Sequence, residues 1–175
     1  MKRGQPYRIG EEGLWESMDL SYKVTKYSRG VSRGAVDETI KRAFKIWEDA
    51  TCFNFTRKDK ESVDIEISFE SGIHGDDYPF DGEGKILAHA FLPKYGGDIH
   101  VDDDEPWSVN SIQETSLLMT LTHEIGHSLG LSHSNNSSAI MWYLYQDSSP
   151  NLTLHNDDIR GIQKLYGDIT CGTVG

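Results

Sequence analysis

Two histidines lie four residues apart, at His123 and His127, and a glutamate directly follows the first of them. In an α-helix, residues four apart share a face, so both imidazoles can reach one metal ion. Zn²⁺ binds histidine nitrogen readily, and a carboxylate beside the ligands is placed to act as a general base. His123 and His127 are therefore candidate zinc ligands, and Glu124 is the candidate catalytic base.

Gly130 and His133 extend this pattern to HExxHxxGxxH. The glycine lets the chain turn sharply, so that His133 can return as a third ligand. Three protein ligands leave the fourth tetrahedral position open to water, which is typical of a catalytic zinc site. The alternative is a helix with solvent-facing histidines, but chance yields the extended pattern only about once in ten thousand sequences of this composition.

A second group of histidines falls in a loop-and-strand region. His74, His89 and His100 lie there beside Asp76. Three histidines and one aspartate would fill a tetrahedral zinc site and leave no open position, as in a structural site. Scattered histidines can equally be ordinary polar surface, and we interpret the seventh, His155, in that way.

The elements that must position these residues follow from the spacing of apolar residues. Strands are expected at 20–26, 63–69, 86–91 and 98–101, with a PKYGG turn between the last two. Helices are expected at 31–49, with Ser32 as N-cap, and at 156–166, ended by Gly167. The helix with the HExxH pattern should begin at Ser111, with Glu114 completing a capping box, and stop at Gly130.

Composition narrows the class of protein. The chain has 175 residues, which suits one domain, and its net charge of −11 makes nucleic acid an improbable partner. No apolar run is long enough to span a membrane. Four N-x-[ST] sequons, at Asn54, Asn135, Asn136 and Asn151, favour a secreted chain whose signal has been removed. The two cysteines, Cys52 and Cys171, could pair or both be free.

The segment HEIGHSLGLSHS, from His123 to Ser134, resembles the zinc signature of the matrixins, the matrix metalloproteinase family of the metzincin clan. Met141 matches the family's methionine turn beneath the zinc. Similar segments are HGDDYPFDGEG (74–84), LAHAF (87–91), GGDIHVDDDEPW (96–107) and DDIRGIQKLYG (157–167). The resemblance covers most of the chain, from about Leu20 to Gly167, and suggests a catalytic domain at 20–167 between an N-terminal segment (1–19) and a C-terminal tail (168–175).

The resemblance implies an α/β (α+β) fold of the metzincin type. Its features would be a twisted, mixed five-stranded sheet, three helices, and a cleft between a larger N-terminal and a smaller C-terminal subdomain. It implies a secreted, monomeric, zinc-dependent endopeptidase that hydrolyses extracellular or matrix-type proteins with a metal-activated water, and that protein inhibitors of matrixins can bind. It also implies that His74, Asp76, His89 and His100 hold a structural zinc.

Calcium and substrate sites are implied in the same way. One calcium would be bound by Asp81, Asp102, Glu105 and the carbonyls of Gly82, Gly84 and Ile86. A second would use Asp64, Gly96 and Asp98, although the loop between His89 and His100 is about two residues shorter than is usual in the family. Substrate would pair with the strand at Leu87 and Ala88, and its selectivity pocket would be lined by Met119, Tyr143 and Tyr145; alternatively, Met119 is a plain core residue.

Two other hypotheses remain. After Met141 the family usually has Tyr-Pro, whereas this chain has Trp142-Tyr143. Met-x-Tyr resembles the turn of astacins and serralysins, in which Tyr143 would serve as an extra zinc ligand or an oxyanion partner. The other hypothesis is a binding module that holds metal but no longer cuts, and the presence of Glu124 counts against it.

Overall fold

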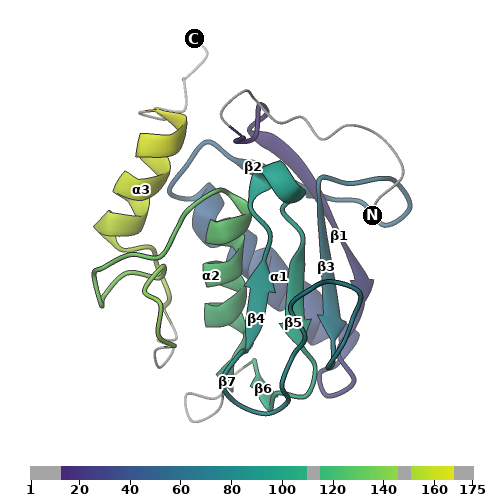
Figure 1. Ribbon diagram of the computed structural model, residues 1–175. Coiled ribbons are helices and arrows are strands. Elements are labelled where there is room, and N and C mark those ends of the chain that lie inside the picture. Colours follow the sequence, from purple (N-terminus) through teal and green to yellow (C-terminus); the bar gives the residue numbers. More distant parts are fainter. Residues whose placement is uncertain (1–12, 110–114, 146–150, 168–175) are drawn as a thin grey trace.

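The computed structural model describes residues 13–109, 115–145 and 151–167 (Figure 1). Five strands form one sheet in the order β2-β1-β3-β5-β4. Within it, β4 is antiparallel to β5 and the other neighbours are parallel. The strands are β1 (Asp19–Lys26), β2 (Asn54–Arg57), β3 (Ile65–Glu70), β4 (Ala88–Ala90) and β5 (Ile99–Asp102).

Three α-helices accompany the sheet: α1 (Arg33–Glu48), α2 (Leu117–Ser128) and α3 (Asn156–Tyr166). A 3-10 turn, η1 (Pro93–Tyr95), connects β4 to β5, and two short strands, β6 (Trp107–Ser108) and β7 (Thr115–Ser116), pair with each other. Figure 1 shows α3 to the side of α2, away from the sheet. The predicted mixed five-stranded sheet with three helices is therefore confirmed.

The main core joins the sheet to α1 and α2. Alternate residues of β3 are fully buried, because β3 lies between β1 and β5 and presents this face to the helices. The α1 residue Trp47 is also fully buried, and its Nε1 donates to the carbonyl of Thr122 on α2 (2.9 Å). This contact fixes α2, which carries the HExxH pattern, against the rest of the core.

Most of the predicted elements are present, with small shifts in their ends. Ser32 caps α1, and its hydroxyl accepts from the amide of Ala35. The expected strand at 86–91 is shorter, because only Ala88–Ala90 pair regularly with β5. The prediction omitted β2, since three of its four residues are exposed and it has no apolar alternation.

The predicted start of the second helix was wrong. α2 begins at Leu117, and Ser116 is its N-cap, with its hydroxyl accepting from the amide of Met119 (3.3 Å). Ser116 is in extended conformation and belongs to β7, which ends the helix on that side. The expected capping residues Ser111 and Glu114 lie outside the described residues.

Cys52 is disulfide-bonded, while Cys171, the other cysteine of the chain, lies outside the described residues. None of the helices in the described ranges combines the length and the apolar character that crossing a membrane would require.

Candidate active site

The histidines of the HExxHxxGxxH pattern meet at one point. His123 and His127 lie one turn apart on α2, and Gly130 follows the helix with a φ of 101°, a left-handed conformation that favours glycine. The chain reverses there and brings His133 back to the helix. One ring nitrogen from each of the three histidines lies within 4.8 Å of the others.

The hydrogen bonds of the rings show which nitrogens are bare. Nδ1 of His123 lies 2.7 Å from the carbonyl of Ile140, and Nδ1 of His127 lies 2.7 Å from the carbonyl of Leu131. A carbonyl only accepts, so both Nδ1 atoms carry the proton and both Nε2 atoms present lone pairs. Burial lowers the pKa of His123, and burial together with the nearby His123 lowers that of His127 to about 4, which favours the neutral form that a metal would need.

The spacing of these nitrogens fits a zinc ion. Nε2 of His127 lies 3.2 Å from Nε2 of His133. Ligands of a tetrahedral zinc with bonds of about 2.0–2.1 Å are roughly 3.3 Å apart. A cation bound between the Nε2 atoms of His127 and His133 would stabilise their close approach. The residues present therefore fit a zinc ion.

Glu124 follows His123 on α2, and its side chain is shielded from solvent. It is nearly fully buried, one carboxylate oxygen has no hydrogen-bond partner, and burial raises its pKa to about 8. It lines both cavities that flank the histidines. A buried, unpartnered carboxyl next to three metal-type nitrogens is suited to exchanging a proton with a group bound there.

The backbone at Ile140 and Met141 contacts the chain at both ends of the HExxHxxGxxH segment. Met141 is fully buried, and its carbonyl accepts from the amide of Ser134 (2.7 Å), the residue after His133. The adjacent Ile140 carbonyl accepts from His123. One turn of backbone therefore contacts His123 directly and anchors the residue after His133.

Sequence reasoning missed the residues that hold this turn. The carboxylate of Asp158, at the start of α3, accepts from the amides of Ile140 (2.9 Å), Met141 (3.0 Å) and His155 (2.9 Å). The interpretation of His155 as an ordinary surface residue was wrong, because it is the N-cap of α3 and its Nδ1 accepts from the amide of Asp157 (3.1 Å). Acids after a polar residue at the start of a predicted helix were the available signal for the cap, but not for the contact of Asp158 with residues 140 and 141.

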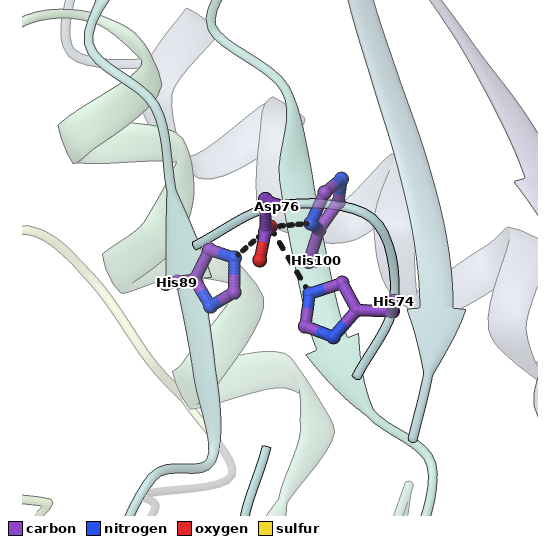
Figure 2. A group of neighbouring side chains, drawn as sticks. All are labelled: His74, Asp76, His89 and His100. Atoms are coloured by element: carbon purple, nitrogen blue, oxygen red, sulfur yellow. Dashed lines mark hydrogen bonds and ion pairs between the residues drawn. The ribbon is translucent and has the colours of Figure 1, made fainter. Parts of the chain in front are cut away.

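The second histidine group also converges (Figure 2). His89 comes from β4, His100 from β5, and His74 and Asp76 from the loop before β4. One oxygen of Asp76, Oδ2, lies 3.1 Å from Nε2 of His74, 3.0 Å from Nε2 of His89 and 2.8 Å from Nδ1 of His100. The opposed positions of His89 and His100 in the β4–β5 ladder bring two of these rings together.

The hydrogen bonds of this group again fit a cation. Nδ1 of His74 lies 2.8 Å from the carbonyl of Gly72 and so carries the proton, which leaves Nε2 bare and facing a carboxylate oxygen. That Nε2 is buried and has no hydrogen-bond partner. Although burial would raise it, hydrogen bonds from Tyr78, His89 and His100 lower the pKa of Asp76 to about 2, so the carboxylate is charged.

The acids expected to bind calcium lie in two different settings. Asp102 and Glu105 are buried, one oxygen of Asp102 lacks a partner, and Oε1 of Glu105 accepts from the amide of Gly84 (2.5 Å). Burial raises the pKa of both. Asp64 accepts from the amide and hydroxyl of Ser21, and Asp98 from the amide of Glu66, so both also serve as strand acceptors.

A cleft runs between β4 and α2 and has one cavity on each side of the histidines. The first, of about 230 Å³, brings together the residues expected to bind substrate: Leu87, Ala88, Met119, Tyr143 and Tyr145. The second, of about 430 Å³, follows β4 in the other direction, from Ala88 to Leu92. His123, Glu124 and His133 line both. β4 is an edge strand of its sheet, so its outer edge faces this cleft.

Mixed sheet, histidine triad and methionine turn together define a domain of the metzincin type. The family model described as Matrixin matches residues 14–167. The chain is 47% identical over 157 residues to stromelysin-2 of Rattus norvegicus, and 44% identical over 167 residues to matrix metalloproteinase-18 of Xenopus laevis. It is also 44% identical over 156 residues to matrilysin of Rattus norvegicus. The chain belongs to the matrixin family.

These alignments cover 87%, 94% and 87% of the chain, but only 33%, 36% and 58% of the respective relatives. The chain thus spans about a third of the first two relatives. Membership of the matrixins, rather than of the astacins or serralysins, decides between two of the initial hypotheses. The suggested role of Tyr143 as a ligand stays a prediction: its exposed side chain lines the same cavity as His123, which does not test whether it would reach a bound metal.

Proposed function

We propose that the chain is a zinc-dependent endopeptidase. The observation that carries the proposal is the convergence of three imidazoles, two of them with a bare Nε2, beside a carboxyl that has an unpartnered oxygen. His123, His127 and His133 would hold the ion, which when bound supplies a Lewis acid for a water and for the scissile carbonyl. Family membership and the relatives named matrix metalloproteinase and stromelysin support this activity.

The chain's own residues account for the remaining chemistry. In its ionised form, Glu124 accepts a proton from the attacking water on its unpartnered carboxylate oxygen and passes it to the leaving amine. The edge of β4 at Leu87 and Ala88 pairs with an extended substrate backbone. The first cavity, between Met119 and Tyr145, takes the side chain that follows the cut.

The test is cleavage of an internally quenched peptide with a Leu-like residue after the cut. The wild type should cleave it, and Glu124→Gln should lose at least a hundredfold in kcat/KM while keeping bound zinc. A chelator should abolish cleavage, and added zinc should restore it. If the wild type binds zinc but cuts no peptide, the binding-module hypothesis replaces the protease.

We also propose structural metals. His74, Asp76, His89 and His100 would bind a second zinc with no open position, supported by the bare, buried Nε2 of His74. Asp81, Asp102, Glu105 and the carbonyls of Gly82, Gly84 and Ile86 would bind calcium, supported by the unpartnered oxygen of Asp102. Asp64, Gly96 and Asp98 are proposed for a second calcium. Elemental analysis of wild type against His74→Ala and Asp102→Asn would count these ions separately.

An extracellular location is proposed as well. Disulfide bonding of Cys52 favours an oxidising compartment, and the four sequons agree with passage through the secretory pathway. Protein substrates follow from the proposed activity. Glycosidase-sensitive mass on protein secreted by a eukaryotic host would support this location, whereas a free Cys52 thiol in native material would contradict it.

A further inference from the structure

Lys85 stands at the rim of the first cavity, at the end farthest from the second. It lines this cavity together with Ile86 and Leu87, and the segment from Trp142 to Tyr145 forms the opposite wall. Among the described residues that line either cavity of the cleft, Lys85 is the one lysine or arginine, and the one acid is the buried Glu124. Lys85 therefore places a cationic group at the rim of this half of the cleft, where Asp81, which does not line either cavity, is its ion-pair partner.

The backbone of Lys85 is strained. Its φ is 63°, and it is the one non-glycine residue with a positive φ in the described part of the chain. Residues with long side chains rarely adopt this left-handed conformation, which glycine and asparagine accept more easily. Strained backbone conformations cluster at binding and active sites. At residue 85, glycine or asparagine would adopt the same turn at a lower energetic cost than lysine.

The ammonium group of Lys85 is available to a ligand. The side chain is 80% exposed, and its Nζ lies 3.2 Å from Oδ2 of Asp81. An ammonium group has three N–H donors, so this one partner leaves others free. Nearby apolar side chains are also exposed, namely Ile86, Tyr143 and Leu144, so the rim offers apolar surface beside the charge.

An extended substrate would bring one particular side chain to this rim. Successive side chains of an extended chain point in opposite directions. If the residue after the cut fills the first cavity, the next residue points out of it. Since Lys85 lies beyond Leu87 and Ala88 along the same wall, this second residue passes beside Lys85.

We propose that Lys85 selects substrates with a glutamate at the second residue after the cleaved bond. This inference rests on the proposed peptidase function and adds a substrate class to it. The carboxylate would pair with the Lys85 ammonium, while its methylene groups contact the apolar rim of Ile86 and Leu144. An exposed ion pair supports a preference of about two- to fivefold over glutamine in kcat/KM.

The experiment uses three quenched peptides that are identical except for Glu, Gln or Lys at this position. The wild type should cleave them in the order Glu, Gln, Lys, with the difference shrinking in 1 M salt, where charges are screened beyond about 3 Å. Lys85→Gln removes the charge, keeps a polar though shorter side chain, and should bring the Glu:Gln ratio to about one. Lys85→Glu should reverse the order, and Lys41→Gln, on the exposed face of α1, should keep the wild-type ratio.

The outcomes separate the two proposals. If the wild type cleaves none of the peptides, the protease function itself fails. If it cleaves the Gln peptide but the Glu:Gln ratio is one, or if Lys85→Gln retains the preference, the role of Lys85 is overturned and the protease stands. A ratio that follows the charge at position 85, in variants with wild-type melting temperatures, supports it.

Discussion

The Met141 sulfur occupies the space that a side chain on Gly126 would need. Gly126 lies on α2 between the two helical zinc-ligand candidates, and Met141 and Trp47 both approach it closely. The absence of a side chain at residue 126 is what lets Met141 pack against α2 at a residue that lies between His123 and His127 in the sequence. This contact explains a glycine in the middle of a helix, where it is otherwise unfavourable.

We therefore expect Gly126→Ala to destabilise the protein. Alanine has the better helix propensity by about 1 kcal/mol, but its methyl group would overlap Met141 and Trp47. Overpacking of this kind lowers the free energy of unfolding by about 1–3 kcal/mol and would shift the histidines, so peptide cleavage should fall as well. Urea unfolding and kcat/KM measure the two effects.

The matched control for this prediction is Gly34→Ala in α1, where a β-carbon would meet open space. That substitution should leave the free energy of unfolding unchanged or raise it by up to about 1 kcal/mol. Equal stability of Gly126→Ala and wild type would show that Met141 does not need the space.

His155 is expected to stabilise α3 as its N-cap. Replacing it with alanine removes the acceptor for the amide of Asp157 and should cost about 1 kcal/mol of unfolding free energy. His155→Ser supplies a different capping side chain and should restore most of that loss. The loss should appear in chemical denaturation, and a wild-type value for His155→Ala would remove the capping role.

We predict that ionisation of Tyr166 lowers the free energy of unfolding in alkaline solution. Burial raises its pKa to about 12, against about 10 in an unfolded chain, while its hydroxyl donates to the carbonyl of Leu129 (2.7 Å). The folded protein thus retains this proton more strongly than the unfolded chain. The stabilisation is complete below pH 10 and is lost as the pH rises from 10 towards 12.

Tyr166→Phe isolates this effect. At pH 8 the variant should be less stable by about 1 kcal/mol, because it lacks the hydrogen bond to Leu129. The difference from wild type should then narrow between pH 10 and pH 12, as followed by denaturant unfolding at each pH. A constant difference across this range would mean that Tyr166 titrates alike in both states.

The parts of the site with regular spacing could be predicted from sequence. Ligands four apart on a helix need only helical geometry, so His123 and His127 followed from the pattern alone. The convergence of His74, His89 and His100 depends on how β4 pairs with β5 and on a long loop, and their spacing in sequence carries no such information. For these residues the resemblance to a known family was needed.

Other features could not be predicted because they depend on contacts between distant segments. Asp158 binds backbone amides at residues 140 and 141, and nothing local to α3 indicates this. The left-handed backbone of Lys85 could not be predicted from the sequence either, since lysine is not among the residues enriched at positive φ. The start of α2 was placed too early because Ser111 and Glu114 imitate a capping box, whereas the pairing of β7 with β6 keeps residues 115–116 extended.

The most direct test of the whole account is the zinc content of His127→Ala beside its cleavage of the quenched peptide. We predict two zinc ions per wild-type chain and one in this variant, with cleavage lost and the remaining ion held by the group around Asp76. A folded His127→Ala protein that keeps two zinc ions and still cleaves the peptide at the wild-type rate would contradict the account.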